Sequence, residues 1–257
     1  MAGLQVLHRL PARTGWVVKQ VAWVVLGIVV YFGVRGRTAA SPETARENAE
    51  EVVALERRLG IQVEGALQAP VNESATLEAV VNWIYIWGHW PVIIATMVWL
   101  VWRHRVVFVR LRDAMMISGG VGMVVFALYP VMPPRLADLG LLDTVTNSSE
   151  AYRVLQPPAF VNQYAAMPSL HSGWDLLVGM AIVAAASSVW LRAIGFIMPM
   201  LMAVAVVFTA NHYILDVVAG VSLVLVAHAA ALALERRRAR HDAPAGCSAE
   251  DETLSAA

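Results

Sequence analysis

The 257-residue chain is 58% hydrophobic, has a mean hydropathy of +0.60 and carries 15% charged residues. Soluble globular domains carry about 25% charged residues, so this composition predicts an integral membrane protein. The formal net charge is zero, which argues against a nucleic-acid partner. The single cysteine, Cys247, lies in a polar tail, which excludes a disulfide framework and a thiolate metal site.

Apolar segments long enough to cross a bilayer recur along the chain. A spanning helix needs about 20 mostly apolar residues. The segments that qualify are 16–34, 77–102, 114–131, 172–190, 193–210 and 213–234. The sequence therefore predicts an all-α membrane protein, a six-transmembrane-helix bundle over residues 16–234.

Arginines follow these spans in a regular pattern. With six crossings, the basic clusters fall on one side of the membrane: Arg9, Arg13, Arg103, Arg105, Arg110, Arg112, Arg192, Arg236, Arg237, Arg238 and Arg240. Basic residues in short loops favour the cytoplasmic side. We therefore expect residues 1–15 and a polar, disordered tail at 235–257 in the cytoplasm, in a chain of the plasma membrane.

The segment 42–68, between the first two predicted spans, has an amphipathic pattern. Ser41 and Pro42 form a helix start, and apolar residues then recur at helical spacing. We expect an amphipathic helix that lies on the outer leaflet. A solvated connector that packs loosely on the bundle is the alternative.

His171 and His212 each stand at the beginning of a predicted span, the fourth and the sixth. Two crossings separate these spans, so both histidines are expected on the outer face. Asp216 follows His212 by four residues and shares its helix face. An aspartate there can accept a hydrogen bond from one imidazole nitrogen, which fixes the tautomer and leaves the other nitrogen as a nucleophile.

Residues suited to anion binding are expected on the same face. Ser169 begins the fourth span, where free backbone N–H groups attract an anion. Arg135, in the loop after the third span, offers a planar fork of donors for phosphate oxygens. Asp175 follows His171 by four residues and is a candidate to orient that imidazole. The set favours phosphate chemistry at the outer surface.

These residues also have structural interpretations. Polar residues at helix ends often serve as caps, and Arg135 after a double proline could anchor its loop at the lipid headgroups. Asp175 could equally pair with another span. His89, followed by Pro91 inside the second span, is interpreted as a packed residue at a kink, some way from the outer ends.

Two motifs, MPSLH at 167–171 and NHYILD at 211–216, resemble the last two motifs of the type 2 phosphatidic acid phosphatase superfamily of membrane enzymes. With YPVMPPR at 129–135, they resemble a particular branch, the bacterial relatives of the inositolphosphotransferase (aureobasidin-resistance) group. Two further segments resemble that branch as well: 45–61 and 82–93.

The resemblance covers about residues 46 to 220, and two positions depart from the superfamily pattern. Leu128 stands where the first motif has a lysine, and Val206 stands where an arginine is usual. The resemblance therefore implies that phosphate binding depends on Arg135, on helix-terminal N–H groups and on another arginine brought in by folding.

The family's chemistry implies roles for the candidate residues. His212 attacks phosphorus, Asp216 supports it, and His171 protonates the departing oxygen and then acts as base toward the acceptor. Arg135 and amides near Ser169 bind the phosphate oxygens. The resemblance implies no cofactor and no metal. A water acceptor makes the protein a phosphatase, and an alcohol acceptor makes it a phosphotransferase. A site at the outer face predicts a phosphorylated lipid as substrate.

Other function classes fit parts of the pattern. His171, His212 and Asp216 are a ligand set that zinc hydrolases use, which would make the protein a metal-dependent membrane hydrolase. Polar helix mouths also suit a non-catalytic lipid-binding or transport protein, and an inactive scaffold is a further alternative. The sequence identifies no protein partner.

Overall fold

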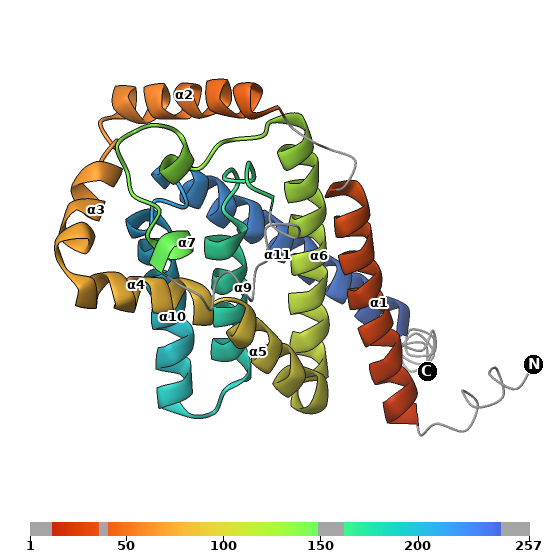
Figure 1. Ribbon diagram of the computed structural model, residues 1–257. Helices are drawn as coiled ribbons and strands as arrows, with labels where there is room; N and C mark the ends of the chain where they lie inside the picture. The colour runs from red at the N-terminus through yellow and green to blue at the C-terminus, as the bar shows by residue number, and fades with distance from the viewer. Residues whose placement is uncertain (1–11, 36–40, 149–161, 243–257) are drawn as a thin grey trace, which may run out of the picture.

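The structure, a computed structural model, describes three stretches of the chain: residues 12–35, 41–148 and 162–242 (Figure 1). Within these stretches the chain forms helices and no strand, with an isolated parallel bridge between Val131 and Ala165. The predicted all-α class is confirmed. Residues 1–11 and 243–257, which belong to the predicted cytoplasmic ends, lie outside the described residues.

The predicted outer helix at 42–68 is two helices, α2 (Pro42–Leu59) and α3 (Glu64–Glu73), so the prediction of a single helix was wrong. Gly60 separates them in the left-handed region, with φ 70°. Its N–H donates to the Arg57 carbonyl at 3.2 Å. A left-handed glycine is a common helix stop. The apolar spacing continues across Gly60, which is why periodicity alone did not indicate the break.

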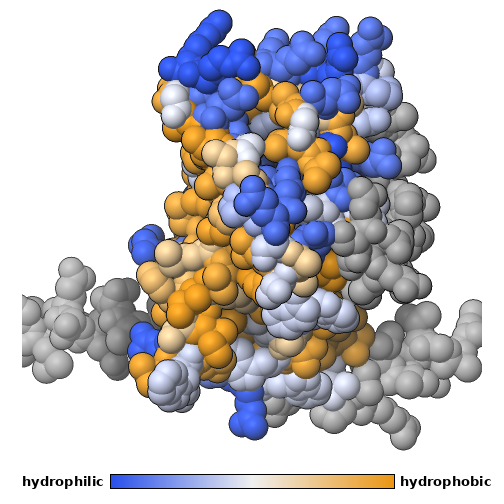
Figure 2. Space-filling view, turned by 60° about the vertical axis from the view of Figure 1, so that its left-hand side comes forward, coloured by the Kyte–Doolittle hydropathy of each residue, from blue (hydrophilic) through white to orange (hydrophobic). Residues whose placement is uncertain are grey.

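Helix α2 covers one end of the bundle, across the top of Figure 1. Figure 2 shows hydrophilic residues at that end and a more hydrophobic surface below them. The buried side of α2 packs on the loops at the ends of other helices through a single cluster: Ala45, Ala49, Val52, Val53, Val131, Met132, Ala166 and Tyr213. The apolar face that we expected to contact lipid therefore contacts the chain itself, and a position on the outer leaflet stays a prediction.

The second predicted span, 77–102, is divided into α4 (Ala75–Trp87) and α5 (Trp90–Arg103). Gly88 and His89 separate the two helices, and a proline follows in the first turn of α5. Proline has no N–H to donate and its ring clashes with the preceding turn, so a helix stops ahead of it. The predicted kink is therefore confirmed. The next helix, α6 (Arg105–Leu128), is longer than predicted and follows α5 almost directly.

The C-terminal half supplies α9 (Leu170–Ala185), α10 (Val189–Phe208) and α11 (Ile214–Asp242). Helix α9 packs against α5, α6, α10 and α11, so it lies at the centre of the bundle. Between α6 and α9 the chain forms the short helices η2 (Pro134–Leu136) and α7 (Thr144–Ser148). The first helix, α1 (Ala12–Arg35), packs on α6.

Helix α11 continues beyond the predicted end at residue 234, so residues 235–242 are helical and not a disordered tail. Arg110 of α6 donates two hydrogen bonds to the Glu235 carboxylate, at 2.7 and 2.9 Å. Arg238 donates to Asp113 at 2.6 Å. These ion pairs hold residues 235–242 of α11 against α6. The partners lie far apart in the chain, so the sequence near residue 235 does not reveal the pairing.

Four helical stretches are long and apolar enough to cross a membrane by length and composition: Ala75–Arg103, Arg105–Leu128, Val189–Phe208 and Ile214–His241. Helix α9 is apolar but shorter, and the predicted first span lies within α1. The four stretches support the membrane class. The count of six spans stays a prediction.

Candidate active site

A tight turn between α10 and α11 carries His212. After α10 ends at Phe208, Ala210 adopts a left-handed backbone with φ 52°, which few residues other than glycine do. The Val206 carbonyl oxygen accepts hydrogen bonds from the N–H groups of Asn211 and His212, at 3.1 and 3.0 Å. These bonds fix the direction in which the His212 side chain leaves the turn.

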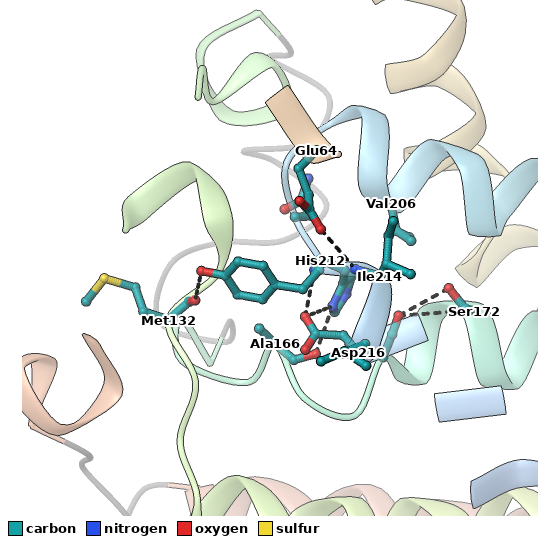
Figure 3. A network of polar contacts seen from close by, with 12 residues as sticks. Glu64, Met132, Ala166, Ser172, Val206, His212, Ile214 and Asp216 are labelled. Atoms are coloured by element: carbon teal, nitrogen blue, oxygen red, sulfur yellow. Dashed lines mark hydrogen bonds and ion pairs between the residues drawn. The ribbon is translucent and has the colours of Figure 1, made fainter. Parts of the chain in front are cut away.

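The His212 imidazole lies beside two acceptors (Figure 3). Its Nδ1 is 2.8 Å from the carbonyl oxygen of Ala166 and 3.4 Å from Oδ2 of Asp216. The Asp216 Oδ2 also accepts a hydrogen bond from the Tyr213 N–H at 2.9 Å. A carbonyl oxygen only accepts, so Nδ1 carries the proton and Nε2 carries the lone pair. The i, i+4 neighbour is present as the spacing indicated, and Ala166 is an acceptor that the spacing did not indicate.

Ser169 and His171 lie at the start of α9. Ser169 is the N-cap, and its hydroxyl oxygen accepts a hydrogen bond from the Ser172 N–H at 3.4 Å, so this hydroxyl serves the helix end. His171 lies in the first turn, where backbone N–H groups lack helical acceptors. Its Nε2 is buried and has no hydrogen-bond partner among the described residues. With its proton on Nε2, this imidazole can donate a hydrogen bond to an anionic ligand at the helix N-terminus.

The rings of His171 and His212 are neighbours although they are far apart in the sequence. Their centroids lie 5.7 Å apart, with the ring planes at 54°. The Ser169 N–H donates to the Asp216 carbonyl oxygen at 2.9 Å, which ties the start of α9 to the start of α11. Gly220 permits this approach, because a Cβ atom there would overlap the Ser169 carbonyl.

Arg135 in η2 is held against the turn that carries His212. Its backbone N–H donates to the Ala210 carbonyl oxygen at 2.9 Å, and its Nε donates to Asn211 Oδ1 at 3.0 Å. Asp143 lies 3.6 Å from the same Nε. The Nη1 atom of Arg135 is buried and has no hydrogen-bond partner among the described residues. A fixed guanidinium with one unused nitrogen is a donor for an anion bound beside His212.

His89, at the break between α4 and α5, is a neighbour of His171 that we predicted to lie away from the outer ends. Its ring centroid lies 4.3 Å from that of His171, and its Nδ1 lies 2.7 Å from Asp175 Oδ1. The prediction that His89 lies away from the site was therefore wrong. Of the two interpretations of Asp175, the structure supports pairing with another span, since its partner is His89 and not His171. The sequence feature that could have indicated a functional position for His89 was an ionisable residue inside an apolar span. Counting crossings placed His89 by its position along the span and did not show that the kink brings its ring to His171.

Two buried glutamates also reach the site from α2 and α3. Glu56 Oε1 accepts a hydrogen bond from the Leu215 N–H at 2.9 Å, and Glu64 Oε1 accepts from the Ile214 N–H at 3.3 Å. Burial raises the pKa of Glu56 to about 8, and the neighbouring Glu64 side chain acts in the same direction. Both side chains satisfy N–H groups at the start of α11, the helix that follows His212.

Residues 50–230 match the family described as the PAP2 superfamily. This range is more than half of the 257 residues and includes all the site residues described above. The chain belongs to the PAP2 superfamily. No curated protein and no solved structure matches the chain.

PAP2 proteins are phosphoric ester hydrolases, so the coarse prediction of a membrane phosphatase is supported. This PAP2 chain departs from the usual pattern at Val206, whose side chain is buried and whose carbonyl holds the turn before His212. The arginine described next to that turn is Arg135.

The zinc alternative requires His171, His212 and Asp216 to converge on one ion. In the part of the PAP2 chain that the structure describes, no group of three or more His, Cys, Asp and Glu side chains could hold a metal ion. His212 directs Nδ1 toward Ala166 and Asp216.

Proposed function

We propose that this PAP2 protein transfers the phosphoryl group of a phosphorylated lipid through a phosphohistidine intermediate on His212. The observation that carries the proposal is the pair of imidazoles, His171 and His212, whose ring centroids are 5.7 Å apart. Each ring has a separate task available, because His212 has its Nδ1 committed to Ala166 and His171 has a buried, unpaired Nε2. One nucleophile and one proton donor are what a two-step phosphoryl transfer requires.

In the first step, the Nε2 lone pair of His212 attacks phosphorus as the bond from phosphorus to the lipid oxygen breaks. The proton on Nε2 of His171 moves to the departing oxygen, so the alcohol leaves uncharged. The Nδ1–H bond to Ala166 keeps the attacking nitrogen in its nucleophilic tautomer. The Asp216 carboxylate stabilises the positive charge that forms on the His212 ring.

In the second step, the acceptor oxygen attacks phosphorus and the bond from phosphorus to Nε2 of His212 breaks. The acceptor proton moves to Nε2 of His171, which restores the starting state. Water as acceptor completes a phosphatase cycle, and an alcohol completes a phosphotransferase cycle. No resident metal or cofactor takes part in this scheme.

The non-bridging phosphate oxygens bind to Arg135 and to the start of α9. The unpaired, buried Nη1 of Arg135 is a charged donor, and the first-turn N–H groups near Ser169 add the positive end of the helix dipole. Donors fixed in advance stabilise the charge that develops in the transition state. Ser169 itself acts through its position at the N-cap.

The membrane setting follows from the four apolar helices and the arginine pattern. We propose six spans over residues 16–234, with residues 1–15 and 235–257 in the cytoplasm, α2 at the outer surface and the site facing outward in the plasma membrane. A site at that surface meets lipid headgroups laterally and water from above. The motif resemblance further suggests the inositolphosphotransferase branch, in which the acceptor is an alcohol.

The proposal is tested with purified protein and a panel of ³²P-labelled lipid phosphates. We expect label to appear as released phosphate or on an added alcohol, and a brief acid-free quench to trap alkali-stable label on the protein. His212→Ala should lose both the trapped label and turnover, whereas His228→Ala, in the middle of α11, should keep them. Retained turnover in folded His212→Ala protein would end the nucleophile assignment.

Two further measurements test whether turnover requires a metal and which side of the membrane the site faces. Turnover that survives exhaustive chelation supports the metal-free scheme, and turnover that zinc restores after chelation would support the metal-dependent alternative. Hydrolysis of a membrane-impermeant phosphate ester by right-side-out vesicles, with none by inside-out vesicles, is expected for an outward-facing site. The reverse result would invert the proposed topology.

A further inference from the structure

His89 is a buried histidine for which the proposed reaction has no role. It is 3% exposed, and its ring lies 4.3 Å from the ring of His171 at an interplanar angle of 38°. Tyr85 of α4 stacks on His171 from a centroid distance of 4.9 Å. The broken span between α4 and α5 therefore supplies two rings that contact the proton donor of the reaction.

Asp175 holds His89 in this position. Its Oδ1 lies 2.7 Å from Nδ1 of His89, and the side chain is 0% exposed. Asp175 follows His171 by four residues, so it lies one helical turn further along α9. Its Oδ2 is buried and has no hydrogen-bond partner among the described residues. Burying a carboxylate is costly unless it is hydrogen-bonded, and the His89 imidazole supplies that hydrogen bond here.

The site thus contains two histidine–carboxylate pairs, with a third histidine close to both. Asp216 lies 3.4 Å from Nδ1 of His212, and Asp175 lies 2.7 Å from Nδ1 of His89. In the described part of the chain, no carboxylate forms an ion pair with His171. His171 therefore lies between two histidines, His89 and His212, each of which contacts a carboxylate.

We propose that His89 and Asp175 are positioning residues for proton transfer by His171, an inference that rests on the function proposed above. The His89 ring holds the His171 ring toward the departing oxygen. The Asp175 carboxylate, through its 2.7 Å contact with Nδ1, fixes the orientation of the His89 ring that holds His171. The proton passes from Nε2 of His171 to the oxygen as the bond to phosphorus breaks, and His89 and Asp175 exchange no atom with the substrate.

Leaving-group chemistry separates this role from a structural one. An alkyl phosphate releases a strongly basic oxygen that must be protonated, whereas p-nitrophenyl phosphate releases a weakly basic phenolate that leaves without a proton. In single-turnover measurements of alcohol release, Asp175→Asn and His89→Gln should each slow an alkyl lipid phosphate by about 10- to 100-fold and p-nitrophenyl phosphate by less than about threefold. A purely structural contact would slow both substrates equally.

Matched variants complete the test. His171→Ala should give the same split between the two substrates, and His104→Gln, the same substitution at the other end of α5, should change neither rate. Folding is judged from the thermal midpoint, and if Asp175→Asn does not fold, His89→Gln provides the same comparison. Equal slowing of both substrates, or no slowing of the alkyl substrate, in a folded variant overturns this inference alone. Turnover of either substrate by His212→Ala would overturn the proposed function instead.

Discussion

His212 donates its Nδ1–H to the main-chain carbonyl oxygen of Ala166, at 2.8 Å. Ala166 lies shortly before α9, and His212 lies shortly before α11. The segment that leads into α9 therefore supplies the acceptor for the histidine that precedes α11. A main-chain acceptor keeps its place whatever side chain stands at position 216. The tautomer of His212 is therefore held by the backbone, which leaves the Asp216 carboxylate, at 3.4 Å, an electrostatic role.

The Asp216→Asn variant tests whether the Ala166 carbonyl holds the tautomer of His212 while the Asp216 carboxylate acts through its charge. Asparagine keeps an oxygen acceptor for the Tyr213 N–H but has no negative charge to stabilise the ring of His212. We expect kcat to fall by about 10- to 100-fold, the equivalent of about 1.4–2.8 kcal/mol of transition-state stabilisation, with phosphohistidine still formed. Labelled-protein trapping and steady-state kinetics measure both quantities. A loss as complete as that of His212→Ala would mean that Asp216, and not Ala166, holds the tautomer.

Gly220→Ala tests the contact between the two helix starts. The new methyl group would overlap the Ser169 carbonyl, so α9 and α11 must separate and His171 must move away from His212. We expect overpacking to cost about 1–3 kcal/mol of unfolding free energy. Turnover should fall by about 100-fold or more, since small misplacements have large effects on rate. Thermal unfolding in detergent and kcat give the two readouts.

Gly120→Ala is the control for that variant. A Cβ atom at Gly120, on α6, meets no heavy atom within 4 Å. The substitution should leave turnover unchanged and raise stability by up to about 1 kcal/mol, because alanine favours the helix over glycine. Full activity in Gly220→Ala would show that the site tolerates separation of the two helices.

Arg135→Lys tests the phosphate donor. Lysine keeps the charge but lacks the fork that bonds Asn211 through Nε while another nitrogen faces the ligand. We expect kcat/KM to fall by about 100-fold, or about 2.7 kcal/mol, in line with the loss of one oriented donor. Arg192→Lys, at the exposed start of α10, is the matched control and should leave kcat/KM unchanged. An Arg135→Lys protein with unchanged kcat/KM would leave the arginine a structural role only.

Glu56→Gln tests how α2 holds the start of α11. The pKa of Glu56 is raised from 4.5 to about 8, first by burial and then by Glu64, so the folded state favours the protonated side chain. The stability that this preference contributes is fully present below about pH 4.5 and is lost as the pH rises through about 8. Glutamine resembles the protonated side chain and should remove this dependence from the thermal midpoint.

Glu47→Gln, on the exposed side of α2, is the control for the pH series and should keep the wild-type slope. The readout is the thermal midpoint between about pH 4.5 and about 8. A Glu56→Gln protein whose midpoint still falls across this interval would assign the pH dependence to other groups.

Features that depend on neighbours in the sequence were predictable. Apolar length and low charge predicted a helical membrane protein, and the four long apolar helices agree with this. The starts of α9 and α11 were near the predicted positions, because caps and changes in periodicity mark them. The break before α5 was indicated by its proline. The left-handed stop at Gly60 was missed, because the apolar spacing runs through it.

The sequence by itself determined which side chains are candidates for phosphate chemistry, since spacing and helix position alone singled out His171, His212 and Asp216. Only the tertiary structure decided which carboxylate meets which histidine. A spacing of four residues puts two side chains on one helix face but leaves their partners open, because another element can approach that face more closely. Asp175 meets His89 for this reason: the bend between α4 and α5 brings that ring to α9.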